Sequence, residues 1–201
     1  MLQVDRILNS IFDSITWLLS ENGSNQVWLV DCGDMEPIIE IIKGKNIVGV
    51  LLTHAHFDHI FGLPELLKHY PDCRIYTNEN GRETLADAKL NMSFFHETPL
   101  TVSGPQITIC GEGDVIQLFQ NFTARVYETP GHHPSCITFC VDKYLFTGDA
   151  YIPGCKVVTN LPKGNKVKAQ ESLGRILNMS EGKMILSGHK INERDDLCIG
   201  F

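Results

Sequence analysis

The amino-acid sequence predicts an α/β fold in which two mixed β-sheets pack together and helices cover their outer sides. Three observations support this prediction. The chain has 201 residues, of which 43% are hydrophobic and 20% charged, and we expect residues 1–201 to form a single domain. Each half of the chain runs from β-hairpin patterns into α/β elements. The apolar run 47–52 has the length and composition of a buried strand.

The first half begins with strand patterns. Strands are expected at 4–8, 14–19 and 26–30, and the turn-like residues 21–25 favour an antiparallel meander. Asp34 then stands where it could cap a helix. The elements expected after it are a helix at 35–43 ended by Gly44, the strand 47–52, a helix at 63–69 with Pro64 in its first turn, a strand at 73–77 and a helix at 79–88.

The second half is richer in strands. Residues 91–104 show no clear period and are expected to form a loop. A second irregular loop is expected at 153–168, which contains proline, glycine and lysine residues. The remaining elements expected in this half are strands at 107–110, 115–118, 123–129, 136–141 and 143–147, a helix at 169–179 and a closing strand at 183–187.

Composition narrows the classes of partner. The formal net charge of −7 argues against a nucleic acid as the principal substrate. No apolar stretch reaches membrane-spanning length, and the N-terminus lacks the pattern of a signal peptide. We therefore expect a cytoplasmic protein that acts on a small molecule, without a nucleic-acid or membrane partner. The sequence does not predict the oligomeric state.

The most informative motif is Thr-His-Ala-His-Phe-Asp-His at residues 53–59, directly after the strand expected at 47–52. Imidazole nitrogens suit zinc, iron, copper and nickel, and a carboxylate adds an oxygen ligand. Because alternate side chains of an extended segment point the same way, His54 and His56 can bind one ion. Asp58 and His59 follow where the chain turns, so they can face a second ion.

Three later segments repeat one pattern, in which an apolar strand is followed by a glycine and then by a possible metal ligand. These segments end in Gly131-His132, Gly148-Asp149 and Gly188-His189. Glycine allows the backbone to bend sharply and to come close to an ion. Each segment alone is a weak indication, but together and in this order they indicate that the metal site has further ligands.

These motifs, H-x-H-x-D-H, T-P-G-H, G-D and G-H in that order, resemble the signature of the metallo-β-lactamase superfamily. The resemblance implies a four-layer αββα sandwich of two mixed β-sheets with outer helices and a metal site at one edge. It makes Asp31 a structural support below the site and not a ligand. It assigns His54, His56 and His132 to a first metal, Asp58, His59 and His189 to a second, and Asp149 to a bridge between them.

The resemblance also implies an activity. Two zinc ions, with iron or manganese as alternatives, would lower the pKa of a shared water molecule, and the resulting hydroxide would attack a small ester-like substrate. Asp58 would orient this nucleophile, which makes it the expected catalytic residue. A thioester of the hydroxyacylglutathione type is the first expectation, because lactamases of this superfamily tend to carry cysteine or serine where this chain has Asp149.

Several alternatives stay open. A lactonase or another ester or amide hydrolase would use the same ligands, and persulfide dioxygenases of this fold hold a single iron. A non-catalytic metal-binding module is the least favoured alternative. Hydroxyacylglutathione hydrolases usually carry a C-terminal helical extension that binds glutathione, whereas residues 190–201 alone follow His189, so we expect the thiol carrier or the substrate to differ.

The sequence departs from the pattern of the superfamily beside the second motif. His133 follows the ligand His132, and we expect it to face solvent, with a role behind the ligands or toward the substrate as the alternative. Cys136 replaces a small hydroxyl residue and is expected to be a small buried residue at the start of a strand. The basic run 163–168 is expected to be a solvated loop that could otherwise hold an anionic substrate.

Overall fold

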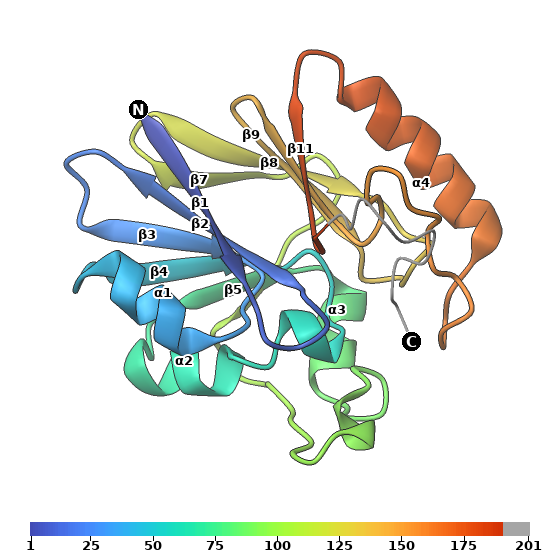
Figure 1. The fold of residues 1–201 in the computed structure, drawn as a ribbon, viewed down its shortest axis with the longest axis horizontal. Coiled ribbons are helices and arrows are strands. Elements are labelled where there is room, and N and C mark those ends of the chain that lie inside the picture. The colour runs from blue at the N-terminus through green and yellow to red at the C-terminus, as the bar shows by residue number, and fades with distance from the viewer. Residues whose placement is uncertain (191–201) are drawn as a thin grey trace.

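The computed structural model describes residues 1–190, which form two β-sheets packed face to face with helices on the outer sides (Figure 1). The first sheet has the order β1-β2-β3-β4-β5-β6 and the second the order β11-β10-β9-β8-β7. The strands of the first sheet are β1 (Leu2–Leu8), β2 (Ile15–Glu21), β3 (Gln26–Val30), β4 (Asn46–Leu51), β5 (Arg74–Thr77) and β6 (Ile107–Ile109). Those of the second are β7 (Val115–Phe119), β8 (Phe122–Glu128), β9 (Ile137–Val141), β10 (Tyr144–Gly148) and β11 (Met184–Ser187).

Both sheets are mixed. In the first sheet β1, β2 and β3 pair antiparallel, as the expected meander requires, and β3 to β6 pair parallel. In the second sheet β7 to β10 pair antiparallel, and β11 pairs parallel with β10. A parallel pair needs a crossover connection, so the helices lie on the outer faces of the sheets.

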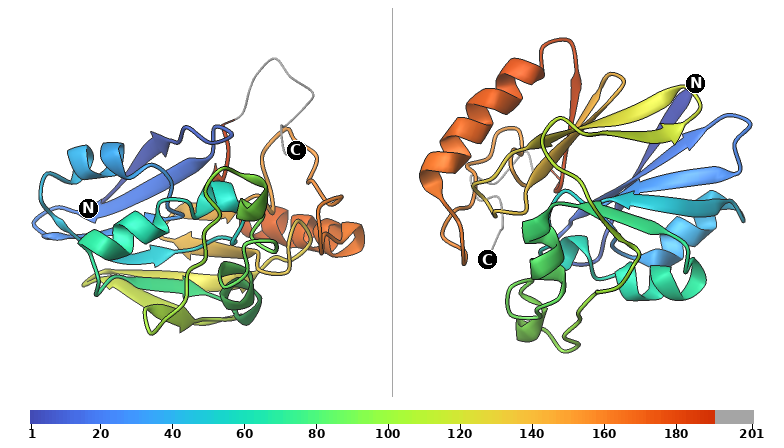
Figure 2. Two further views of the ribbon diagram at one scale, coloured as in Figure 1. Left: turned by 90° about the horizontal axis from the view of Figure 1, so that it is seen from below. Right: turned by 180° about the vertical axis from the view of Figure 1, so that it is seen from behind.

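The helices complete the four layers. Helices α1 (Met35–Ile42) and α2 (Leu63–His69) cover the outer face of the first sheet, whereas α4 (Lys166–Met179) covers the second sheet (Figure 2). Helix α3 (Glu79–Leu85) contacts β5 and β6. Two short 3₁₀ helices, Phe57–His59 and Ser93–Phe95, complete the helical elements of the described chain. Within residues 1–190, no helix combines the length and apolar character needed to cross a membrane.

Alternate side chains of a strand in the first sheet enter two different cores, one under the outer helices and one between the sheets. In β3, Val27 and Leu29 pack with the helices outside the first sheet, whereas Trp28 and Val30 pack between the sheets. The Trp28 ring occupies the space beside Gly49, where an added Cβ would lie 2.2 Å from it, and the Trp28 indole donates to the Leu118 carbonyl at 2.9 Å. The two sheets are thus held together by apolar packing and by indole hydrogen bonds, since the Trp17 indole also donates across the sheets to the Ser187 carbonyl at 3.0 Å.

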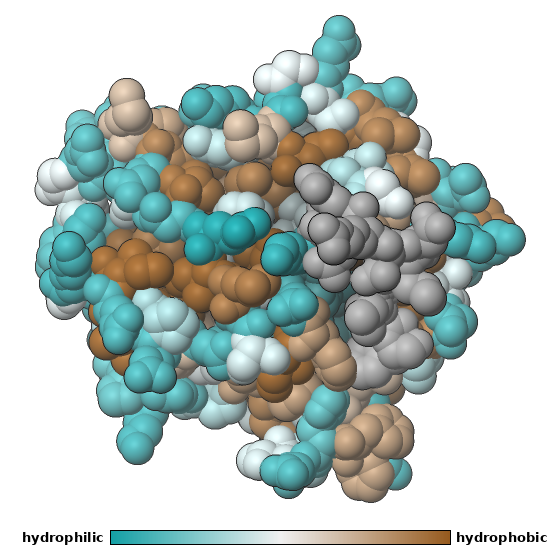
Figure 3. All heavy atoms as spheres, viewed as in Figure 1, coloured by the Kyte–Doolittle hydropathy of each residue, from teal (hydrophilic) through white to brown (hydrophobic). Residues whose placement is uncertain are grey.

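The surface seen in Figure 3 mixes polar and apolar residues. Apolar residues gather over α1, whose exposed side chains include Ile39 and Ile41, while Met35, Ile38 and Ile42 point into the core. A helix of this composition buries one stripe and leaves part of its apolar surface in water.

The predicted four-layer α/β fold is confirmed, and the differences are local. Asp34 precedes α1 as expected, but its carboxylate accepts from the Ser10 amide and hydroxyl and does not cap the helix. Helix α3 ends at Leu85 and not at residue 88, and α4 begins at Lys166 because the Asn165 side chain caps it by accepting from the Lys168 amide. The single domain over residues 1–201 stays a prediction, because residues 191–201 lie outside the described part.

Candidate metal centre

The seven predicted ligands meet at one edge of the sandwich, although they come from distant parts of the sequence. Each follows the end of a strand, namely β4, β8, β10 or β11. The structure brings together two sets that we call the first ligand group (His54, His56 and His132) and the second ligand group (Asp58, His59 and His189). His54, His59 and Asp149 form a third, overlapping set, and within each set the candidate ligand atoms lie within 4.8 Å of one another.

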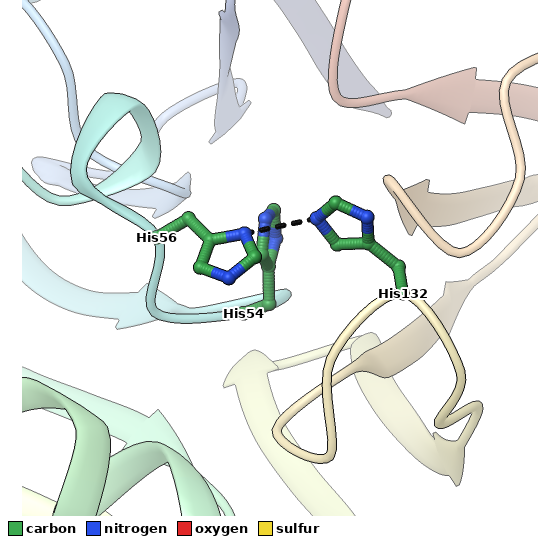
Figure 4. A group of neighbouring side chains, drawn as sticks. All are labelled: His54, His56 and His132. Atoms are coloured by element: carbon green, nitrogen blue, oxygen red, sulfur yellow. Dashed lines mark hydrogen bonds between the residues drawn. The ribbon is translucent and has the colours of Figure 1, made fainter. Parts of the chain in front are cut away.

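The first ligand group is shown in Figure 4. Nδ1 of His56 lies 2.9 Å from Nε2 of His132, and the His54 ring stands edge-on to both, with ring centroids 4.9 and 5.0 Å away. His54 and His56 come from one extended segment after β4, which explains why both reach the same point. All three side chains are almost fully buried.

The second ligand group pairs two imidazoles with a carboxylate. Oδ2 of Asp58 lies 3.1 Å from Nε2 of His189 and 3.3 Å from Nε2 of His59, and the two Nε2 atoms are 3.3 Å apart. The 3₁₀ helix Phe57–His59 turns the chain here, and Asp58 and His59 lie with His189 and not in the group of His56. These residues therefore form a group of their own, and their binding of a separate ion stays a prediction.

Asp149 lies between the two groups. Its Oδ2 is 3.9 Å from Nε2 of His54 and 3.8 Å from Nε2 of His132, both in the first group. The same oxygen is 3.2 Å from Nε2 of His189, and Oδ1 is 3.5 Å from Nε2 of His59. A single carboxylate thus approaches both groups, as a bridging ligand must.

Hydrogen bonds behind the imidazoles fix their orientation. Nδ1 of His132 donates to the Val158 carbonyl, and Nδ1 of His189 donates to the Phe12 carbonyl, each at 2.9 Å. Because Nδ1 donates in both rings, Nε2 is the nitrogen left to face the centre and to bind a metal. Such outer hydrogen bonds set the tautomer of metal-binding histidines.

Asp31 fixes His59 in the same way. Its carboxylate lies 2.9 Å from Nδ1 of His59 and accepts from the Thr53 amide and hydroxyl, each at 2.7 Å. Asp31 is buried and adopts the left-handed conformation, with φ of 60°. It therefore stands behind the ligands and outside the ligand groups, where the resemblance placed it.

The turn between β1 and β2 closes the second group from outside. The Ser14 hydroxyl donates to the Asp58 carbonyl at 2.7 Å, and the Ile15 amide donates to the Gly188 carbonyl at 2.7 Å. Ser14 also forms an isolated antiparallel bridge with His189. Residues near the start of the chain thereby position the last ligand.

Close packing explains one of the glycines that precede a ligand. A Cβ added at Gly188 would lie 2.3 Å from Oδ1 of Asp149 and 2.8 Å from Cε1 of His59. A Cβ atom does not approach other heavy atoms this closely, so only glycine allows β11 to deliver His189 beside the other ligands.

Two imidazoles of the first group, those of His54 and His56, are neutral. Burial, reinforced by neighbouring imidazoles, lowers the pKa of His54 and of His56 well below its ordinary value. A neutral imidazole is the form that binds metal.

Charges in the second group are strongly coupled. Burial lowers the pKa of His59, but Asp58 and other carboxylates outweigh it and hold this pKa well above its ordinary value. In the same way, Asp149 and Asp58 overcome burial and raise the pKa of His189 to about 10. Burial raises the pKa of Asp58, but His59 and His189 hold it well below its ordinary value. The carboxylates are therefore ionised and strongly attract cations.

The donor set fits metal ions by chemistry and by spacing. Within residues 1–190, Nε2 of His54 and Oδ1 of Asp149 are buried without a hydrogen-bond partner, a state that costs roughly 1–3 kcal/mol for each group. Two nitrogens on one tetrahedral zinc, each about 2.1 Å from it, lie about 3.4 Å apart. The spacing of 3.3 Å between Nε2 of His59 and Nε2 of His189 matches this value. The centre therefore satisfies the requirements of a metal site.

Two residues beside His132 have clear positions. The expectation that His133 faces solvent is wrong, because its ring is buried and its Nδ1 pairs with the Ser135 hydroxyl at 2.8 Å. Burial lowers the pKa of His133 to about 4, with smaller effects from His132 and Lys163. Cys136 is a small buried residue directly before β9, as expected.

The basic run 163–168 divides between two elements. Lys166 and Lys168 lie in the first turn of α4, so the expectation of an irregular loop is wrong there. Lys163 stays in the loop and is exposed.

Sequence reasoning missed the backbone carbonyls of Phe12 and Val158, which orient two of the ligands. A carbonyl group is present in every residue, so no residue type marks its role. The expected irregular loop at 153–168 contains Val158 and was the one feature of the sequence that could have indicated this role. It lies close to the T-P-G-H motif in space but not in sequence.

The chain is similar to several known proteins. The family model described as the metallo-beta-lactamase superfamily matches residues 12–189. A hydroxyacylglutathione hydrolase of Hamiltonella defensa is 29% identical over 181 residues, which cover 87% of this chain and 61% of that protein. One of Aliivibrio fischeri (strain ES114) is 32% identical over 146 residues, which cover 71% of this chain and 49% of that protein. The crystal structure of the B3 metallo-β-lactamase BLEG-1 superposes with a TM-score of 0.85 at 26% identity, covering 94% of this chain and 92% of that one. The chain thus spans about half to two thirds of the length of these two curated relatives.

Proposed function

Because the chain belongs to the metallo-β-lactamase superfamily, we propose that it is a metal-dependent hydrolase of small ester-like substrates. Thioesters of the hydroxyacylglutathione type are the first candidates, since the curated relatives named above are hydroxyacylglutathione hydrolases. The observation that carries the proposal is the approach of Asp149 to both ligand groups.

The proposed centre holds two zinc ions. His54, His56 and His132 would hold the first, Asp58, His59 and His189 the second, and Asp149 both. Two ions bound here would activate a water molecule near neutral pH and polarise a carbonyl group. Iron and manganese stay open as alternatives, since imidazole and carboxylate ligands accept both.

Asp58 has a second role in the proposal. Its carboxylate is ionised and is held between Nε2 of His59 and Nε2 of His189, with its backbone carbonyl fixed by the Ser14 hydroxyl. A fixed carboxylate can accept a hydrogen bond from the attacking water and orient it. This makes Asp58 the catalytic residue of the proposal.

The leaving group favours thioesters. A thiolate leaves without a proton, whereas an amine or an alkoxide requires a general acid. Within the described residues, the two ligand groups and Asp149 contain imidazoles and ionised carboxylates. We identify no further side chain among them that could act as a general acid. Thioester hydrolysis is therefore the reaction that these side chains can support without a general acid.

The test combines metal analysis with kinetics. Protein purified without added metal should contain two zinc ions per chain and should hydrolyse lactoylglutathione. His56→Ala should lose metal and activity together, because His56 is a ligand of the first group. Lys166→Ala, on the exposed first turn of α4, is the control and should at most raise KM. A fully metallated and active His56→Ala protein would disprove the ligand assignment, and one iron with oxygen consumption on glutathione persulfide would favour a dioxygenase.

The likeness to BLEG-1 over 92% of its length supports a second candidate, hydrolysis of a β-lactam amide. A chromogenic β-lactam, assayed beside the thioester on the same zinc-loaded sample, separates the two candidates. A kcat/KM at least tenfold higher for the thioester would support the first, and the reverse ratio the second.

A further inference from the structure

His133 is a buried imidazole at the centre that belongs to none of the ligand groups. It follows the ligand His132 directly, and its ring lies edge-on to that of His56, with the centroids 4.9 Å apart and the planes at 63°. Metal binding by the ligand groups therefore does not account for this buried imidazole.

Hydrogen bonds fix the tautomer of His133. The Ser135 amide donates to Nδ1 at 3.2 Å, so Nδ1 carries no proton. The Ser135 hydroxyl lies 2.8 Å from the same nitrogen and accepts from the Ala55 amide at 3.3 Å, which leaves its own proton for Nδ1. A neutral ring with an unprotonated Nδ1 carries its proton on Nε2 and is a donor there.

Nε2 of His133 is available to donate to a bound molecule. Within residues 1–190 the structure shows no hydrogen bond to Nε2 of His133, and this atom is not among the fully enclosed polar atoms that lack a partner. A buried N–H group normally has an acceptor. The acceptor of this group can therefore be a molecule that enters the centre.

We propose that His133 contacts the substrate, and that its Nε2–H donates to the carbonyl oxygen of the bound ester or thioester. The inference rests on the proposed hydrolase function. When hydroxide adds to the carbonyl carbon, the π pair of the C=O bond moves onto the oxygen, and collapse of this adduct expels the thiolate and leaves a carboxylic acid that ionises in water. A fixed N–H group that faces this oxygen stabilises the charge as it develops.

A purely structural role is the competing explanation. The Ser135 hydroxyl links Nδ1 of His133 to the Ala55 amide, in the segment that carries His54 and His56. If His133 only braces this segment, its loss should reduce metal binding. If it donates to the substrate, its loss should reduce turnover while the metal stays bound.

Three variants separate these explanations. His133→Phe keeps a ring against His56 but removes the donor, and His133→Gln restores an N–H donor. Ser135→Ala keeps the imidazole and removes one of its two fixing groups. We expect His133→Phe to lower kcat on lactoylglutathione roughly 100-fold with KM changed less than threefold. His133→Gln should recover at least tenfold of this loss, Ser135→Ala should lose less than tenfold, and zinc content and Tm should match the parent in all three.

An unchanged kcat in His133→Phe would overturn the inference. So would a zinc content that falls in proportion to kcat, or a His133→Gln protein no more active than His133→Phe. If His133→Phe does not fold, the response of the His133 ring to lactate in the parent protein, described next, decides.

A measurement that does not need catalytic turnover tests this inference separately from the proposed function. Nitrogen-15 NMR of the zinc-loaded protein should show an imidazole protonated at Nε2 that is missing in His133→Phe. Added lactate, the carboxylate product of the candidate reaction, should shift this proton signal. A signal protonated at Nδ1, or one that lactate does not move, would overturn the inference even in an active hydrolase. A shift in a protein that hydrolyses none of the substrates would retain the donor role and refute the hydrolase proposal.

Discussion

At the scale of single residues, each oriented imidazole depends on the group behind it. Asp31, Val158 and Phe12 accept the Nδ1 protons of His59, His132 and His189. One of these three acceptors is a side chain and two are backbone carbonyls. Only the Asp31 contact can therefore be removed by a conventional substitution.

We predict that Asp31→Asn weakens zinc binding by about 10- to 100-fold. The amide has one acceptor oxygen where the carboxylate has two, so it cannot serve Thr53 and His59 equally. Titration with a chromophoric chelator measures the affinity. Asp34→Asn is the control, because the Asp34 carboxylate contacts Ser10 outside the centre. Equal affinities of the parent and Asp31→Asn would show that His59 needs no support.

Metal binding should release protons mainly at the second ligand group. In the metal-free protein the raised pKa values of His59 and His189 keep both rings protonated at pH 7, whereas the lowered pKa values of His54 and His56 keep those rings neutral. Metal must displace the protons of the second group, so its affinity there falls as the pH falls through the neutral range.

Calorimetry in buffers of different ionisation enthalpy should find about two more protons released by the second equivalent of zinc than by the first. His189→Ala should remove about one of them. Equal proton release by both equivalents would contradict the charge states described above.

At the scale of elements, four strand ends and the turn between β1 and β2 converge on one point. The convergence leaves space for no additional atom beside β11, since a Cβ at Gly188 would lie 2.3 Å from Asp149. Strand β11 can therefore place His189 at the centre only if residue 188 has no side chain.

Gly188→Ala should destabilise the protein by about 1–3 kcal/mol, because the added methyl group overpacks a rigid site. It should also lower the zinc content. Gly174→Ala is the matched control, since nothing lies within 4 Å of a Cβ at this position in α4, and it should stabilise the protein by up to about 1 kcal/mol. Urea unfolding measures both. The same stability for the two variants would show that the site can expand.

At the scale of the whole molecule, the two sheets meet at an edge that carries concentrated negative charge. Asp58 and Asp31 lie buried there beside the partly buried Asp149, and the imidazoles offset their charge only in part. Divalent ions would complete the neutralisation, so metal binding and folding should be coupled.

Zinc at about 100 times its dissociation constant should raise the free energy of unfolding by about 2.7 kcal/mol. The urea midpoint should move upward with an unchanged m-value, and a chelator should reverse the shift. His56→Ala should show a smaller response. Identical midpoints with zinc and with chelator would mean that zinc does not bind the native state preferentially.

Much of this architecture could be predicted from local patterns. Strand periodicity and turn residues predicted the meander, and the spacing of His54 and His56 predicted a shared face. The glycine pattern marked His132, Asp149 and His189 as possible ligands, but their pairing with the first motif followed only from family likeness, because spacing along the chain does not determine distance in space.

Other features had no local signal. The expectation for His133 was wrong because its burial depends on Ser135 and on the packing of His56. The start of α4 was missed because the Asn165 cap stands within a lysine-rich segment typical of loops. Phe12 and Val158 act through backbone carbonyls, which are identical in every residue.

The pairing of residues 12–15 with residues 188–189 has a consequence for biosynthesis. The His189 ring and the Phe12 carbonyl are 177 positions apart in sequence, so their contact forms only after the ribosome has released almost all of the described chain. A nascent polypeptide could assemble the imidazoles of the first group earlier, but not the complete second group. In the proposed two-metal centre, the second ligand group could therefore bind its ion only after His189 has left the ribosome, and this binding would report that β11 has joined the turn between β1 and β2.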